Sequence, residues 1–551
     1  MDNNYSIFKL KTVRIILFFA VSFVFVFCSR KTDKDEISFK DTATPVPDTT
    51  VLSDVPAWSK YSKMFMYAPT FDFDVMEKAE KYKYKLLASD GKIFSFEAQK
   101  PNLPLSPVWE KIPEGTVFLN IIALNKAGDS IGLAGSRRFY RSIPFQGVTN
   151  TPKQPYKDAA YNALEYIFNL PYIQSWLTST EPDLNYIYYA YPAKTISATM
   201  NVMLQYSENK STSKEDSLKA MIIALNMANY LESLASSKHS LLKVFPVTYN
   251  VEFINQRLKD TVKYPVSFVY DVVNTNANKM MMLYGYEYAN RLLKLYDFTN
   301  DKKWLDIVKS IAESYKDLQL DDGSWYLNID YNSGEPLNES KMIPGILLLF
   351  YKKLELEYGI SGYQDVIDKA DKWIRENPLK TYFWEGQFED VPSFEEPYKN
   401  LSKYPATEYA IYLLRYVPTK NNIAIAKELI RFAEDQFVIW GRPPCDTTIF
   451  ESSEFHTPSV MEQYNYFVPV DASAAQMIKT YIEAYSVTKE KVYFHKAETL
   501  ANSITEQQTN DGKIYTIWYN EDPMQQDWLD CMLESIDALI LFEHTKNERF
   551  N

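Results

Sequence analysis

The sequence is poor in the residue types that bind metals and cross-link chains. Its 551 residues include only three cysteines and four histidines. After Cys28, only Cys445 and Cys531 remain, and they lie far apart, so the bulk of the chain has no disulfide framework. So few ligands argue against a structural zinc site, and no ligand-loop spacing supports calcium. We therefore predict no metal.

Clustered basic residues and cofactor motifs are also missing. The net charge is −12 and no block of Lys and Arg occurs, which argues against nucleic acid as a partner. The chain has no phosphate-binding loop, redox-cofactor motif or nucleophile elbow, so we expect no cofactor. Aromatic residues, in contrast, are abundant, with 42 Tyr, 32 Phe and 10 Trp. They suit core packing, and they also suit surfaces that stack on sugars.

Residues 1–28 have the features of an export segment. Three basic residues precede the apolar run 15–27, which is too short for a comfortable membrane span. The run ends at Cys28, which resembles the acylation site of bacterial lipoproteins, although Phe27 stands where a small residue is expected. The polar residues 29–56 are typical of a flexible tether. We predict an exported lipoprotein, periplasmic or at the cell surface, held to a membrane through Cys28; an uncleaved anchor is the alternative.

Residues 57–148 have short alternating apolar segments separated by polar turns. Such evenly spaced segments predict a small all-β sandwich domain, and the layout is similar to immunoglobulin-like or fibronectin-type modules. The expected strands are 70–73, 82–88, 93–97, 116–125 and 138–141.

From residue 155 to 545 the apolar pattern takes the period of amphipathic helices. Short turns that follow an apolar helix ending in Tyr mark helical hairpins. The helices expected before such turns are 192–206, 277–296, 341–357, 404–416, 471–486 and 527–543. Those expected after the turns are 157–177, 214–235, 303–318, 363–376, 420–435 and 490–507. Pairing the first helix, 157–177, with the last, 527–543, closes twelve alternating helices into an all-α ring, an (α/α)6 toroid, with the first set inside.

A repeated motif supports this repeat architecture. Gln319-Leu-Asp-Asp-Gly323 and Gln508-Thr-Asn-Asp-Gly512 lie 189 residues apart, and the preceding helices match at the same offset without a gap. Because catalysis normally breaks such pseudosymmetry, we interpret the motif as structural. The layout resembles the six-hairpin glycosidase superfamily, which also includes polysaccharide lyases and sugar epimerases. The resemblance implies a carbohydrate-active enzyme with a glycan cleft on one face of the ring, and it assigns no catalytic residue.

The long connections all lead into the helices of the inner set, so they should share one face of the ring. Long loops on a rigid scaffold usually carry function. In loops 319–340, 377–403, 436–470 and 508–526, 17 acidic residues stand against five basic ones. An electronegative face suits general acid/base work at a glycosidic bond, whereas a lyase acting on uronates would need cations. Trp325, Trp384, Trp440 and Trp518 lie in the same loops and are candidates for stacking on sugar rings.

The densest group of candidates lies between residues 454 and 466. Glu462 is a candidate general acid, and His456 a candidate for proton transfer or substrate binding. Tyr464 and Tyr466 are candidate substrate contacts, and either could serve a lyase together with His456.

Further candidates come from other loops. Asp527 and Trp528 open the last helix of the inner set, where capping competes with catalysis and stacking. Asp390 follows Glu389, and such an adjacent acidic pair is either exposed or part of a site. Asp271 lies near the start of the second inner helix. We predict a glycoside hydrolase with two carboxylates from Glu462, Asp527, Asp390 and Asp271. The alternatives are a polysaccharide lyase and a non-catalytic glycan-binding lipoprotein.

Overall fold

The computed structural model describes residues 62–260, 263–264, 267–391, 398–442, 450, 454–519 and 528–550. All of them belong to one compact unit. The predicted export segment and tether, together with Cys28, Cys445 and Asp527, lie outside the described residues. Within the described part of the chain, no helix has both the length and the apolar character needed to cross a membrane.

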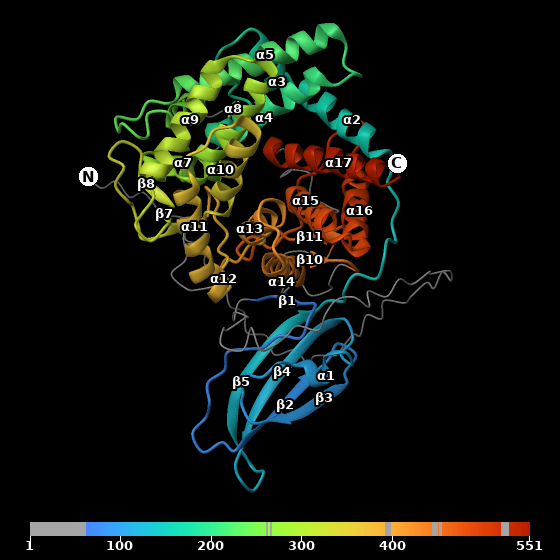
Figure 1. The fold of residues 1–551 in the computed structure, drawn as a ribbon. Coiled ribbons are helices and arrows are strands. Elements are labelled where there is room, and N and C mark those ends of the chain that lie inside the picture. Colours follow the sequence, from blue (N-terminus) through green and yellow to red (C-terminus); the bar gives the residue numbers. More distant parts are fainter. Residues whose placement is uncertain are drawn as a thin grey trace, which may run out of the picture. The chain divides into compact units, whose positions relative to one another are not determined.

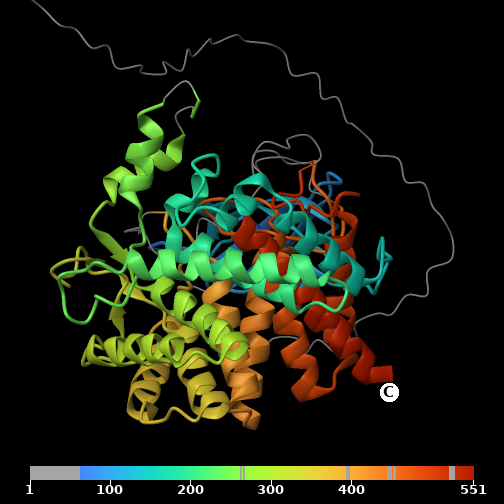
Figure 2. The same cartoon turned by 90° about the horizontal axis from the view of Figure 1, so that it is seen from above.

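Twelve of the described helices alternate between an inner and an outer set, as the sequence predicts (Figure 1). The inner set is α4 (Pro192–Glu208), α8 (Leu283–Thr299), α10 (Gly345–Tyr358), α13 (Tyr404–Arg415), α15 (Asp471–Thr488) and α17 (Leu529–Phe550). The outer set is α2 (Tyr156–Phe168), α5 (Lys214–Ser233), α9 (Lys302–Asp317), α11 (Gln364–Glu376), α14 (Lys420–Phe437) and α16 (Lys491–Glu506). Each inner helix contacts the next, and α17 contacts both α4 and α2, so the ring closes as predicted. In Figure 2 the helices follow in chain order from green through yellow and orange to red.

Burial separates the two sets. Outer helix α5 buries Ala220, Ile223, Ala224, Met227, Ala228 and Leu231, the single stripe of an amphipathic helix. Inner helix α4 buries every residue from Thr195 to Leu204, because neighbours cover it on all sides. One predicted inner helix starts too early. Residues 279–281 form strand β6 (Lys279–Met281), which pairs with β8 (Asn328–Asp330), and α8 begins only at Leu283.

The repeated motif joins neighbouring outer helices. The Gln319 side-chain amide donates to the carbonyls of Gly323, at 3.1 Å, and Val366, at 3.0 Å. Gln508 donates in the same way to Gly512, at 2.8 Å, and to Ala159, at 2.9 Å. Val366 belongs to α11 and Ala159 to α2, so one copy ties α9 to α11 and the other ties α16 to α2 across the ring closure.

Both glycines of the motif are required by the backbone. Gly323 has φ +91° and Gly512 has φ +99°, a region that side chains rarely adopt. A Cβ atom on Gly323 would lie 2.3 Å from the carbonyl oxygen of Lys369, and one on Gly512 would lie 2.2 Å from that of Asn162. The motif is therefore structural, as the sequence analysis indicates.

The N-terminal strands form one five-stranded sheet of order β1-β5-β4-β2-β3. The strands are β1 (Met64–Phe65), β2 (Lys81–Leu87), β3 (Ile93–Ala98), β4 (Gly115–Leu124) and β5 (Ser130–Arg141). β1 runs parallel to β5 and the other pairs are antiparallel. The buried side chains of β2 and β4 alternate along each strand.

The predicted sandwich is not what the described residues form. The buried face of the sheet is covered by the segment around Phe71 and by helix α1 (Ser106–Trp109), whose Trp109 packs on Phe139, and not by a second sheet. The expected strand 70–73 is irregular chain, and its Phe73 ring lies over Gly135, where a Cβ atom would clash at 2.3 Å.

Hydrogen bonds join this sheet region to the ring. Asp435 of α14 accepts the backbone N–H groups of Met66 and Tyr67, both at 2.6 Å. The ring of Phe145 lies against Trp440, with 4.9 Å between centroids.

Short elements occupy the connections. They are α3 (Pro171–Gln174), α6 (Val251–Leu258), α7 (Phe268–Thr275), β7 (Trp325–Tyr326), β9 (Lys341–Met342), α12 (Pro378–Thr381), β10 (Val438–Ile439) and β11 (Ser459–Val460).

Candidate functional site

Four inner helices direct one face each toward the axis of the ring. The spacing is the same in all four, because residues four apart lie on one face of a helix. The pairs are Glu287 and Arg291 on α8, Tyr404 and Glu408 on α13, Ala472 and Gln476 on α15, and Asp530 and Glu534 on α17. All eight side chains line one cavity of about 200 Å³, called here the inner cavity.

A second cavity, called here the outer cavity, adjoins the first and has a volume of about 520 Å³. Loop residues line much of it, including Asp390, Tyr466 and Ser267. The two cavities have five lining residues in common: Lys194, Phe388, Glu462, Trp528 and Asp530. Three of these lie at the first turns of α4 and α17 or directly before α17, so the site lies at the N-terminal ends of the inner helices.

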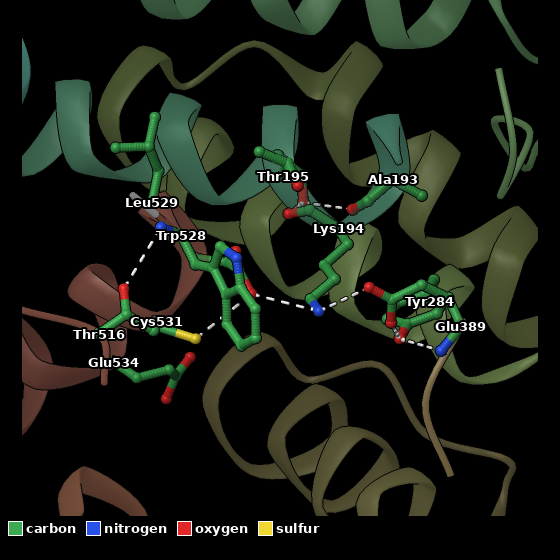
Figure 3. A network of polar contacts seen from close by, with 12 residues as sticks. Ala193, Lys194, Thr195, Tyr284, Glu389, Thr516, Trp528, Leu529, Cys531 and Glu534 are labelled. Atoms are coloured by element: carbon green, nitrogen blue, oxygen red, sulfur yellow. Dashed lines mark hydrogen bonds and ion pairs between the residues drawn. The ribbon is translucent and has the colours of Figure 1, made fainter. Parts of the chain in front are cut away.

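Lys194 forms the centre of a buried polar network (Figure 3). Its Nζ lies 2.8 Å from Oε1 of Glu389 and 3.4 Å from Oδ2 of Asp530. The hydroxyl of Tyr284 donates to the other oxygen of Glu389, and that of Tyr249 donates to the Glu389 backbone carbonyl at 2.7 Å. Burial alone would raise the pKa of Glu389, but Lys194 and Tyr284 outweigh it and hold the pKa below its ordinary value. Glu389 is therefore an ionised, fully bonded group.

Asp390 differs sharply from its neighbour. Its side chain is exposed, and it lines the outer cavity. Desolvation of its carboxyl by the surrounding protein and the negative charge of Glu389 raise its pKa to about 6, while the positive charge of Lys194 opposes the shift. Near neutral pH Asp390 is thus mostly ionised and able to accept a proton.

Glu462 is the opposite case. Its side chain is only 7% exposed and lines both cavities. Among the described residues, none forms a hydrogen bond or ion pair with its carboxyl group. Burial raises its pKa to about 7, with Lys403 opposing the shift and Asp390 adding to it. Two carboxyl groups whose environments separate their pKa values are the arrangement that acid/base catalysis needs.

The backbone around Glu462 is fixed by several bonds. Its N–H donates to the carbonyl of Val468 at 2.9 Å, and its own carbonyl accepts from Nζ of Lys403 at 2.8 Å. The neighbouring loop is attached as well, since the Asn400 amide donates to Gln463 at 2.9 Å. Glu462 is therefore held in place through its backbone while its carboxyl stays open to the cavities.

The sequence candidates divide into two groups. Glu462, Asp390, Tyr466 and Trp528 line the cavities together. His456 and Asp271 are exposed and line neither of these two cavities.

The prediction that aromatic residues of the long loops contact sugar is wrong for five of them. Trp325, Trp384, Trp440, Trp518 and Tyr464 are all buried in the core and line neither cavity. Each is held by contacts of its own. The indole N–H of Trp325 donates to the carbonyl of Tyr315, and that of Trp518 donates to the carbonyl of Tyr515.

The other three are equally engaged. Trp440 donates to Glu434 at 3.0 Å, Trp384 stacks on Tyr409, and the Tyr464 hydroxyl bonds to Gln436. These rings pack the loops onto the helices and do not present a sugar-binding face.

Sequence reasoning missed the site residues inside helices. Lys194, Glu287, Glu408, Asp530 and Glu534 all belong to inner helices and line the inner cavity. The sequence did contain a signal for them. Acidic residues occur in helices that the ring architecture predicts to be apolar on every side.

No protein-family model and no curated protein matches the chain. Among solved structures, a family 76 glycoside hydrolase from a bovine Bacteroides thetaiotaomicron strain is similar at 12% identity, with 88% of this chain and 97% of that chain covered and a TM-score of 0.45. The cellobiose 2-epimerase from Spirochaeta thermophila is similar at 12% identity, with 72% and 97% covered and a TM-score of 0.47. An unsaturated glucuronyl hydrolase from Streptococcus agalactiae is similar at 10% identity, with 73% and 98% covered and a TM-score of 0.42. The function is therefore inferred from the side chains of this chain.

Proposed function

We propose that this protein is a glycoside hydrolase whose site is the pair of adjoining cavities at the axis of the ring. The observation that carries the proposal is the joint placement of two carboxyl groups on the outer cavity: Glu462 is buried and has its pKa raised to about 7, and Asp390 is exposed and has a pKa of about 6. Aromatic side chains at the same wall, Tyr188, Tyr466 and Trp528, suit stacking on sugar rings.

In the proposed reaction Glu462 donates its proton to the glycosidic oxygen as the bond from that oxygen to the anomeric carbon breaks. Asp390 works on the opposite side. It either takes a proton from the water whose oxygen bonds to the anomeric carbon, which inverts the configuration, or bonds to that carbon itself. In the second case a water that loses its proton to the now ionised Glu462 bonds to the carbon as the bond to Asp390 breaks, which retains the configuration. Lys194 stays bonded to Glu389 and Asp530 and holds the charges around the reacting centre.

The charge of the site favours a hydrolase over a lyase. The residues lining the two cavities include seven carboxyl groups, from Glu287, Glu389, Asp390, Glu408, Glu462, Asp530 and Glu534, against Lys194 and Arg291. A lyase must neutralise a uronate carboxylate, and both cations already face carboxylates. Of the lyase candidates His456, Tyr464 and Tyr466, His456 is exposed and Tyr464 is buried, and neither lines the cavities, whereas Tyr466 lines the outer cavity.

The test is reducing-end release from a panel of glycans, with ultraviolet absorbance followed in parallel. We expect new reducing ends without the absorbance of an unsaturated product, and loss of release in Glu462→Gln and Asp390→Asn. The control is Glu376→Gln on outer helix α11, whose side chain is 64% exposed. Release with absorbance would indicate a lyase. Binding without turnover in the wild type would indicate a glycan-binding protein and contradict the proposal.

We also propose that the chain is exported and held to a membrane by a lipid on Cys28. Metabolic labelling with a fatty acid tests this, comparing the wild type with Cys28→Ser. Label on the wild type alone supports the anchor. Equal label on both, or none on either, contradicts it.

A further inference from the structure

Three carboxyl groups in the inner cavity have no partner among the residues that the structure describes. Glu287, Glu408 and Glu462 all line it, and among the described residues none donates a hydrogen bond to these carboxyls or lies within ion-pair distance. Glu534 in the same cavity differs, since it is paired with Lys479 and lies 3.5 Å from Arg291. The three unpaired carboxyl groups face the cavity, where a ligand can reach them.

Glu462 shows that this is more than a collection of acids. Its side chain is more than nine-tenths buried, its carboxyl is unpartnered, and it opens into the cavity that Glu287 and Glu408 line. Burial and the neighbouring carboxylates raise the pKa of Glu408 to about 8, and burial raises that of Glu287 to about 7. Without a ligand, these groups therefore hold protons that an incoming positive charge would displace.

The cations of the protein are already engaged elsewhere. Lys194 bridges Glu389 and Asp530, and Arg291 faces Glu534. Neither cation forms an ion pair with Glu287 or Glu408, so a ligand can supply the positive charge that matches them. The described residues contain no group of three or more His, Cys, Asp or Glu side chains placed to hold a metal ion, which favours an organic cation.

Aromatic walls point to the same kind of ligand. Tyr286 and Trp528 line the inner cavity beside the carboxyls, as does Tyr404, although Nζ of Lys403 already lies 3.8 Å from the centroid of the Tyr404 ring. The faces of Tyr and Trp rings attract ammonium groups, most strongly where water is excluded. A carboxylate and aromatic box of this kind fits a protonated primary amine.

We propose that the inner cavity binds the protonated amine of an amino sugar through Glu287 and Glu408, beside Glu462, so that the glycan enters with a free amine on the residue that reaches the ring axis. This inference rests on the proposed glycoside hydrolase and names the class of its substrate.

The test is calorimetric binding of D-glucosamine, N-acetyl-D-glucosamine and D-glucose to the full chain at pH 7. We expect glucosamine to bind about tenfold or more tightly than either other sugar, as a charge-assisted bond in a dry site requires. It should also release protons on binding, seen as a dependence of the heat on buffer ionisation, while glucose releases none. Glu408→Gln should remove the preference and the proton release. Glu215→Gln, exposed on outer helix α5, should change neither.

Equal binding of all three sugars, or a preference that survives in Glu408→Gln without proton release, overturns the inference. The proton count in the wild type does not depend on any variant folding. Hydrolysis of a neutral glycan without preference for an amine would contradict the amine site and leave the proposed hydrolase standing. Selective glucosamine binding without turnover of any glycan would instead sink the hydrolase and leave the amine site standing.

Discussion

The repeated Gln-x-x-Asp-Gly turns and the cavities at the ring axis both use polar side chains near helix ends, but in opposite ways. In the turns, the amides of Gln319 and Gln508 each find two backbone carbonyls, so their hydrogen-bonding demand is met within the fold. In the cavities, the carboxyl groups of Glu287, Glu408 and Glu462 form no hydrogen bond or ion pair with any of the described residues. The contrast teaches that bonding state, more than residue type or repetition, separates structural from functional polar groups in this ring.

The largest expected effect is on activity. Glu462→Gln keeps the shape of the side chain and removes the proton that it donates, so kcat/KM should fall by about 10²- to 10⁴-fold. Thermal stability should stay the same or rise, because an unpartnered ionisable group is replaced by a neutral one. Steady-state kinetics and a melting curve check both halves. A stable variant with full activity would contradict the role of Glu462.

Substitutions in the repeated Gln-x-x-Asp-Gly turn should lower the stability of the fold without changing the catalytic groups. In Gly512→Ala the new methyl group would lie 2.2 Å from the Asn162 carbonyl oxygen at φ +99°, which we expect to lower the free energy of unfolding by about 3 kcal/mol. Gly362→Ala is the matched control, since Gly362 has φ +106° but nothing within 4 Å of the new atom. Denaturant unfolding of both variants separates contact from backbone strain. Equal losses in the two would show that the contact with α2 is unimportant.

A milder change tests the hydrogen bonds of the same turn. Gln508→Leu removes the side-chain donor to the carbonyls of Gly512 and Ala159 and should lower the free energy of unfolding by about 1–3 kcal/mol. Gln319→Leu should cost less, because Gln319 is partly exposed while Gln508 is buried. Chemical denaturation gives both values. A larger loss at Gln319 would contradict this ordering.

A separate effect is a pH dependence of stability. The folded protein keeps protons on Glu408, whose pKa is about 8, whereas the unfolded chain loses them near the ordinary value. The folded state therefore binds more protons in this window, and the free energy of unfolding should fall as pH rises from about 5 to 8. Glu408→Gln should reduce that slope, while Glu215→Gln should not. An unchanged slope in Glu408→Gln would show that Glu408 does not hold its proton.

The sequence carries the ring architecture because helix periodicity, Tyr-ended turns and a fixed-offset repeat all report on local backbone geometry. It does not carry the bonding state of each polar group. Glu389 and Asp390 are adjacent, yet Glu389 forms an ion pair with Lys194 while Asp390 lines the outer cavity. Trp384 and Trp528 are both candidate stacking residues in the sequence, yet only Trp528 of the two lines the cavities. These outcomes depend on contacts between segments far apart in the chain.

The most direct test of the account is the pH dependence of kcat/KM for the wild type and Glu462→Gln. Asp390 must be ionised, with a pKa of about 6, and Glu462 protonated, with a pKa of about 7. The wild-type profile should therefore rise through about 6 and fall above about 7. The residual activity of Glu462→Gln should lose the alkaline fall and keep the acidic rise. An alkaline limb that persists unchanged in Glu462→Gln would contradict the assignment of Glu462 as the acid.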